Sequence, residues 1–63
     1  MIVDKLEEIY LDMEYGYIKN DENNMIVSGL CGGKYWCRFN YFKKSSILVV
    51  TNTQTSEVLT YNL

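Results

Sequence analysis

Apolar residues recur at helical spacing over the first fourteen residues of the chain. Ile2, Leu6, Ile9 and Met13 follow one another at intervals of four, three and four residues. This spacing places them on one face of an amphipathic helix, with charged residues on the other faces. We therefore predict a helix over about residues 2–14.

After this segment the period of the apolar positions changes from 3.6 to 2. Four turn-rich segments, "NDENN", "CGGK", "KKSS" and "NTQTS", separate short stretches rich in β-branched and aromatic residues. These stretches predict strands at about residues 15–19, 24–30, 34–42, 46–52 and 56–62. The predicted fold class is α+β, in which the N-terminal helix packs on one face of a curved antiparallel meander of four or five strands. We expect residues 1–63 to form a single small domain.

The glycine pair Gly32–Gly33 predicts a two-residue turn, in which both central residues adopt positive φ. That register places Leu30 opposite Tyr35, and Trp36 across the bare backbone of Gly29. When the register is extended through the later turns, one face of the sheet is apolar, and we expect the helix to pack on it. The residues of this face are Ile26, Leu30, Cys37, Phe39, Tyr41, Leu48, Val50, Leu59 and Tyr61. The same register leaves the opposite face bare, with these residues among its members: Met25, Val27, Trp36, Arg38, Phe42, Ile47 and Val49. We predict that a homodimer covers this bare face, with a different protein partner as the alternative.

The two cysteines do not form a recognisable metal or redox motif. Cys31 and Cys37 have C-x5-C spacing and the chain has no histidine, so they cannot complete a tetrahedral zinc site. The predicted turn points them to opposite faces, from which we expect two free thiols and no metal or cofactor. With no signal peptide and no apolar stretch long enough to span a bilayer, the thiols indicate a cytoplasmic protein that does not enter membranes.

Charge is distributed unevenly along the chain. Residues 1–22 carry seven acidic and two basic residues, whereas residues 23–63 carry one acidic and four basic residues. On the predicted helix and just after it, the acidic side chains and one exposed leucine form a possible partner-binding face: Asp4, Glu7, Glu8, Leu11, Asp12 and Glu14. This face is either a solvated helix surface or an acidic surface that docks against a basic partner.

The chain lacks a histidine and every common catalytic motif, which indicates that it is not an enzyme. Our hypothesis is a small protein-binding module: a phage- or mobile-element-encoded inhibitor that occludes a host defence or nucleic-acid-processing protein through its acidic face, in the host cytoplasm. The alternative is a small nucleic-acid-binding regulator, although the acidic helix argues against nucleic acid as a partner. Its binding surface would be the aromatic and basic residues of one strand and the turn after it: Trp36, Arg38, Phe42, Lys43 and Lys44.

Overall fold

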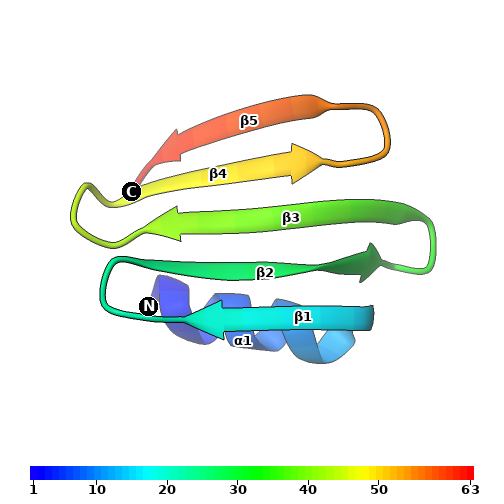
Figure 1. Cartoon of the computed structure of the whole chain (residues 1–63), viewed down its shortest axis with the longest axis horizontal. Helices are drawn as coiled ribbons and strands as arrows, with labels where there is room; N and C mark the ends of the chain where they lie inside the picture. The colour runs from blue at the N-terminus through cyan, green and yellow to red at the C-terminus, as the bar shows by residue number, and fades with distance from the viewer.

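The computed structural model has one helix followed by five strands in chain order. The elements are α1 (Ile2–Asp12), β1 (Glu14–Asn20), β2 (Asn24–Cys31), β3 (Tyr35–Phe42), β4 (Ile47–Asn52) and β5 (Glu57–Asn62). The strands form one antiparallel sheet in the order β1-β2-β3-β4-β5, in which every neighbour in sequence is also a neighbour in space (Figure 1). This arrangement confirms the predicted helix-on-meander fold.

Helix α1 packs on the sheet through the apolar stripe that predicted it. Leu6 is fully buried, and Ile2, Ile9 and Met13 pack around it against the sheet. The helix ends at Asp12, two residues earlier than predicted, because Met13 already adopts an extended backbone. No helix in the structure is long and apolar enough to cross a membrane.

The pairing of β2 with β3 differs from the predicted register by one residue. The connection is a three-residue loop of Gly32, Gly33 and Lys34, so that Cys31 pairs with Tyr35 and Leu30 with Trp36. Both glycines have positive φ, 61° and 69°, as the turn prediction requires. Because side chains alternate between faces, a shift of one residue turns every side chain of β2 to the opposite side.

This shift corrects the predicted faces of the sheet. We call the side on which α1 lies the inner face and the other side the outer face. Met25 and Val27 lie on the inner face, where both are fully buried, so their predicted position on a bare face is wrong. Ile26 and Leu30 take their places on the outer face. The pairing of β3 with β4 and of β4 with β5 follows the predicted register. Tyr41 lies opposite Leu48, and Leu48 lies opposite Tyr61.

The core of the molecule lies between α1 and the inner face of the sheet, and it extends from β2 to β4. It consists of Leu6, Met25, Val27 and Leu48, with half-buried neighbours around them. Figure 1 shows α1 running along β1 and β2, with no helix over β3, β4 or β5. The position of α1 therefore divides the inner face into a covered part and an uncovered part.

Gly29 allows the junction between α1 and β1 to lie directly against β2. A Cβ atom at this position would lie 3.0 Å from the backbone oxygen of Glu14, 3.1 Å from the Cα of Gly16 and 3.1 Å from the Sδ of Met13. Gly29 pairs with Cys37, so the prediction that Trp36 covers it is wrong. The glycine is instead covered from the inner face by the start of β1.

Candidate functional site

The two cysteines lie on the same face of the sheet and form a disulfide. Their Cα atoms are 6.5 Å apart, within the range that a disulfide spans. Cys37 is buried and Cys31 is half-buried, both on the inner face as a result of the one-residue shift. The prediction of two free thiols is therefore wrong, and the cysteines no longer indicate a reducing compartment. No group of three or more His, Cys, Asp or Glu side chains is arranged to hold a metal ion.

The predicted acidic face is present as an exposed surface on α1 and the start of β1. We call it the acidic surface, and its residues are Asp4, Glu7, Glu8, Leu11, Asp12 and Glu14. All six are exposed, and Leu11 is 78% exposed between the carboxylates. None of the carboxylates forms an ion pair, since the one salt bridge of the chain joins Lys19 to Asp21. The structure thus brings these groups together, and their docking against a partner stays a prediction.

Three of the predicted nucleic-acid-binding side chains share the outer face. Trp36, Arg38 and Phe42 alternate along β3 and are exposed, Trp36 by 44% and Phe42 by 40%. The ring of Tyr15 lies 6.0 Å from that of Trp36, centroid to centroid, in a tilted arrangement. Lys44 is also exposed. We use the name aromatic–basic surface for the five residues predicted to bind nucleic acid: Trp36, Arg38, Phe42, Lys43 and Lys44.

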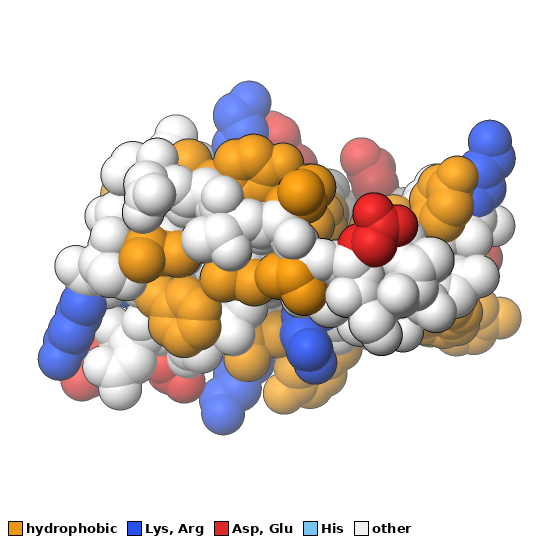
Figure 2. All heavy atoms as spheres, turned by 90° about the horizontal axis from the view of Figure 1, so that it is seen from above, with side chains coloured by type: hydrophobic (Ala, Val, Ile, Leu, Met, Phe, Trp, Pro, Cys, Tyr) orange, Lys and Arg blue, Asp and Glu red, His pale blue; other side chains and the backbone are white.

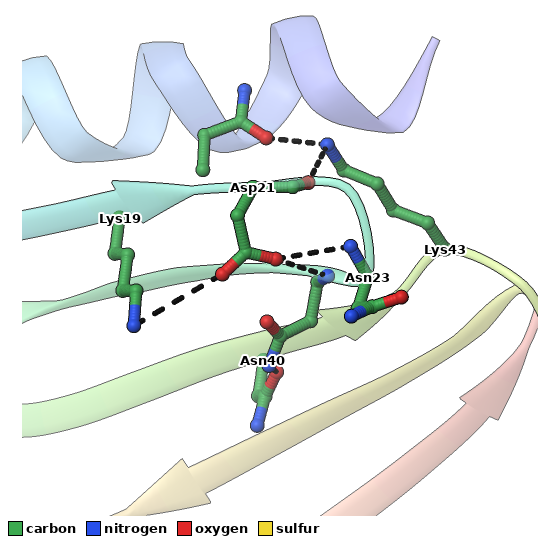
Figure 3. Close-up of polar contacts among 7 residues, drawn as sticks. Lys19, Asp21, Asn23, Asn40 and Lys43 are labelled. Carbon is green, nitrogen blue, oxygen red and sulfur yellow. Dashed lines mark hydrogen bonds and ion pairs between the residues drawn. The ribbon is translucent and has the colours of Figure 1, made fainter.

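Lys43 is held by the turn between β1 and β2 (Figure 3). Its ammonium group donates hydrogen bonds to the side-chain oxygen of Asn20 and to the backbone oxygen of Asp21, the latter at 2.6 Å. The Asp21 carboxylate accepts hydrogen bonds from the backbone N–H groups of Asn24 and Asn23, at 3.1 and 3.0 Å, which lower the pKa of this carboxyl group. The charge of Lys43 is thus directed toward the turn, which weakens its predicted role as a phosphate ligand.

The uncovered part of the inner face is an apolar surface that lies beside the core. We call it the open half, and it consists of these residues of β3, β4 and β5: Tyr35, Phe39, Tyr41, Val50, Leu59 and Tyr61. Phe39, Tyr41 and Val50 are half-buried, whereas Leu59 is 58% exposed, Tyr35 56% and Tyr61 45%. Five strands spaced about 4.8 Å apart are wider than a helix with a diameter of about 10–12 Å. One helix therefore leaves strands uncovered.

A shallow hollow of about 330 Å³ lies within the open half. It is lined by Cys31, Tyr35, Cys37, Phe39, Val50, Asn52, Glu57 and Leu59. Its polar groups are already engaged by the turn after β4: Asn52 accepts hydrogen bonds from the backbone N–H groups of Gln54 and Thr55, and the Thr55 hydroxyl bonds Glu57. The hollow thus offers a partner mainly apolar contact.

The outer face keeps most of the residues predicted for a dimer interface. Trp36, Arg38, Phe42, Ile47 and Val49 share it, without Met25 and Val27. Ile47 and Val49 are half-buried, and Asn40 lies among them with its side-chain oxygen accepting a hydrogen bond from Asn24 at 3.2 Å. A homodimer through this face stays a prediction.

Sequence reasoning missed the open half because it assigned the whole apolar face to the helix. The sequence already predicts one helix and up to five strands. Because one helix is narrower than five strands, part of the sheet had to remain uncovered. No family model, curated protein or solved structure matches this chain.

Proposed function

We propose that this protein is a non-enzymatic protein-binding module whose partner docks on the open half of the inner face. The observation that carries the proposal is the position of α1, which packs on β1 and β2. It leaves Tyr35, Leu59 and Tyr61 exposed on the inner face and Phe39, Tyr41 and Val50 only half-buried. Contiguous apolar surface of this kind is typical of interaction sites.

The residues of the open half suit contact with a protein. Tyr35 and Tyr61 are 56% and 45% exposed, and tyrosine is enriched at protein interfaces. Leu59 is 58% exposed beside them. Fully burying a side chain of this size contributes about 1.5–3 kcal/mol, so that covering the exposed half of each contributes on the order of 1 kcal/mol. A partner that covers all three also completes a core that now contains few fully buried side chains.

Three properties of the chain support a non-enzymatic role. It has no histidine, both thiols are joined in a disulfide, and most of its carboxylates lie on the exposed acidic surface. Acid–base catalysis uses titratable groups that are buried or specifically paired. The carboxylates of the acidic surface are neither buried nor paired. The inhibitor role, the phage origin, docking through the acidic surface and binding of nucleic acid by the aromatic–basic surface stay predictions.

A matched pair of substitutions on β5 tests the proposal. Leu59 and Val58 are neighbours with similar exposure, 58% and 56%, but Leu59 lies on the inner face and Val58 on the outer face. Tagged wild type, Leu59→Lys and Val58→Lys proteins are used to capture partners from a lysate of the source cells, after circular dichroism confirms that all three fold. We expect a protein that wild type and Val58→Lys retain and Leu59→Lys loses. Equal capture by all three proteins, or loss with Val58→Lys alone, contradicts the proposal.

A further inference from the structure

The strand β5 forms one edge of the sheet, and its only protective feature is one charged residue at its start. All six of its residues are exposed, its pairing with β4 has no bulge, and its sequence contains no proline or lysine. Glu57, at one end, is its only charged residue. Edge strands of native proteins are normally protected by such features, because an unpaired row of N–H and C=O groups binds another strand. Figure 2 looks at the molecule from the side of β5, where hydrophobic side chains lie among uncharged polar groups and backbone, one acidic side chain faces the viewer, and lysine and arginine lie mainly toward the margins.

The opposite edge of the sheet, formed by β1, is protected. Its register is interrupted between Glu14 and Tyr17, and Tyr15 within this irregularity has a φ of 54°. Lys19 is exposed farther along the same strand. A bulge and a lysine are two of the means by which edges avoid pairing. The contrast singles out β5 as the edge that is free to accept a strand.

The hydrogen bonds of the meander define which backbone groups of β5 are free. The N–H of Leu63 donates to the C=O of Ser46 at 2.8 Å, in step with the register of β4 and β5. Hydrogen-bonded pairs alternate along an antiparallel ladder. The odd-numbered residues of β5 therefore bond to β4. The even-numbered residues direct their N–H and C=O groups to the open edge: Val58, Thr60 and Asn62.

We propose that the β5 edge binds β5 of a second copy of this chain, antiparallel, about a two-fold axis at Thr60. Thr60 then lies opposite the partner's Thr60, and Val58 opposite the partner's Asn62. Each of these pairs exchanges two backbone hydrogen bonds. A register moved by two residues in either direction leaves one of the three free residues without a partner in the strand. The Thr60-centred register is therefore the one that uses all three residues.

The side chains are compatible with this two-fold pairing. On the inner face Leu59 lies opposite the partner's Tyr61, which continues the apolar open half from one copy into the next. On the outer face two threonines meet, a favourable cross-strand pair. Glu57 lies opposite the partner's Leu63, so that no like charges face each other. This self-complementarity identifies a second copy, rather than an unrelated strand, as the occupant. The inference concerns the edge and holds or fails independently of the proposed function of the open half.

Cysteine substitutions test the register directly. In the proposed dimer the Cα atoms of the two Thr60 residues are about 5.5 Å apart, which a disulfide spans. Those of the two Val58 residues are roughly 14 Å apart, which it does not span. Under mild oxidation we expect Thr60→Cys to form a linked dimer and Val58→Cys alone not to do so. A mixture of Val58→Cys and Asn62→Cys chains should form a linked heterodimer, with the bond mapped by mass spectrometry.

Light scattering on the same proteins tests the dimer without a cross-link. We expect wild type to have twice the 7.4 kDa mass of the chain at tens to hundreds of micromolar. Trp36→Lys changes the outer face but not the β5 edge, so we expect the same doubled mass for this variant. Thr60→Pro removes an edge N–H that β4 does not use, and it should halve the mass. A monomeric wild type, a dimer that Thr60→Pro leaves intact, or equal cross-linking of Thr60→Cys and Val58→Cys overturns the proposal. If Thr60→Pro fails to fold, the cysteine experiment decides alone.

Discussion

Two adjacent residues of β2 test the register that defines the inner and outer faces. Met25 is fully buried beneath α1, whereas Ile26 is half-buried on the outer face. Substituting either residue with alanine removes three heavy atoms beyond Cβ. The two variants thus delete similar volumes from neighbouring positions, and they differ mainly in the face from which the atoms are lost.

The expected costs follow from the burial of the two side chains. At about 0.8 kcal/mol for each buried methylene-sized group, Met25→Ala loses roughly 2.4 kcal/mol of transfer free energy. A cavity under α1 adds to this loss, so that we expect a total of about 3 kcal/mol, within the usual range of about 2–5 kcal/mol. Ile26→Ala leaves no enclosed cavity, and we expect about 1 kcal/mol. A chain of this length has a total stability of about 3–9 kcal/mol, so the first cost is a large fraction of it.

Urea denaturation followed by circular dichroism measures both costs. All proteins should be compared at one protein concentration, because self-association makes the apparent stability depend on concentration. We expect Met25→Ala to lower the unfolding free energy by at least about 1 kcal/mol more than Ile26→Ala. Equal costs would contradict this assignment of the faces, and a larger cost for Ile26→Ala would show that β2 faces the other way, as the two-residue turn predicted.

Four further measurements test other parts of the structure. Gly29→Ala should destabilise the protein by about 1–3 kcal/mol in urea, because its Cβ crowds the α1–β1 junction; an unchanged midpoint would contradict this contact. The pKa of Asp21 is lowered from 3.8 on folding, so its stabilising effect is present above pH 3.8 and is lost as the pH falls through the folded-state value. The difference in urea midpoint between wild type and Asp21→Asn should therefore become smaller from pH 5 to pH 3. A constant difference would contradict the hydrogen bonds of the Asp21 carboxylate in this turn. Substitution of Asp4, Glu8 and Asp12 with lysine should abolish partner binding through the acidic surface, while each substitution lowers the unfolding free energy by less than about 0.5 kcal/mol. Unchanged binding would show that these residues form only a solvated helix face. Thiol counting on denatured, unreduced protein should find no reactive group, and two groups would exclude the disulfide.

The elements and their order could be predicted because each leaves a clear local pattern. The 3.6-residue period of the first segment ends where β1 begins, and each turn-rich segment falls between two strands. The pairing of β3, β4 and β5 was also predictable, since in β4 the residues Leu48 and Val50 continue the face set by Phe39 and Tyr41. Ile47 to Val50 are themselves consecutive apolar residues, so the register of β4 was set by the turn at residues 43–46 and not by alternation.

The register of β2 could not be fixed in the same way. Met25, Ile26 and Val27 are consecutive apolar residues, so either face of the strand satisfies the hydrophobic pattern. The choice then depends on the turn, and a glycine pair is compatible with two-residue and three-residue loops. The disulfide depends on the same choice, because only the three-residue loop places Cys31 and Cys37 on one face. One ambiguous turn thus produced the errors in the faces and the thiols, and the disulfide removed the argument from free thiols for a reducing compartment.

The open half and the free β5 edge have one physical origin, which is the number of elements in the chain. A helix of 11 residues is about 16 Å long and 10–12 Å wide, enough to cover about two strands. The chain supplies five strands and no second helix, and the sheet does not close on itself. Our two proposals share this origin, since in both of them another molecule contacts the strands that α1 leaves uncovered. Because such a molecule binds the folded chain, its binding free energy adds directly to the stability of a fold with a small core. Under these proposals association and folding are coupled, and we expect Leu59→Lys to weaken association while Met25→Ala weakens folding.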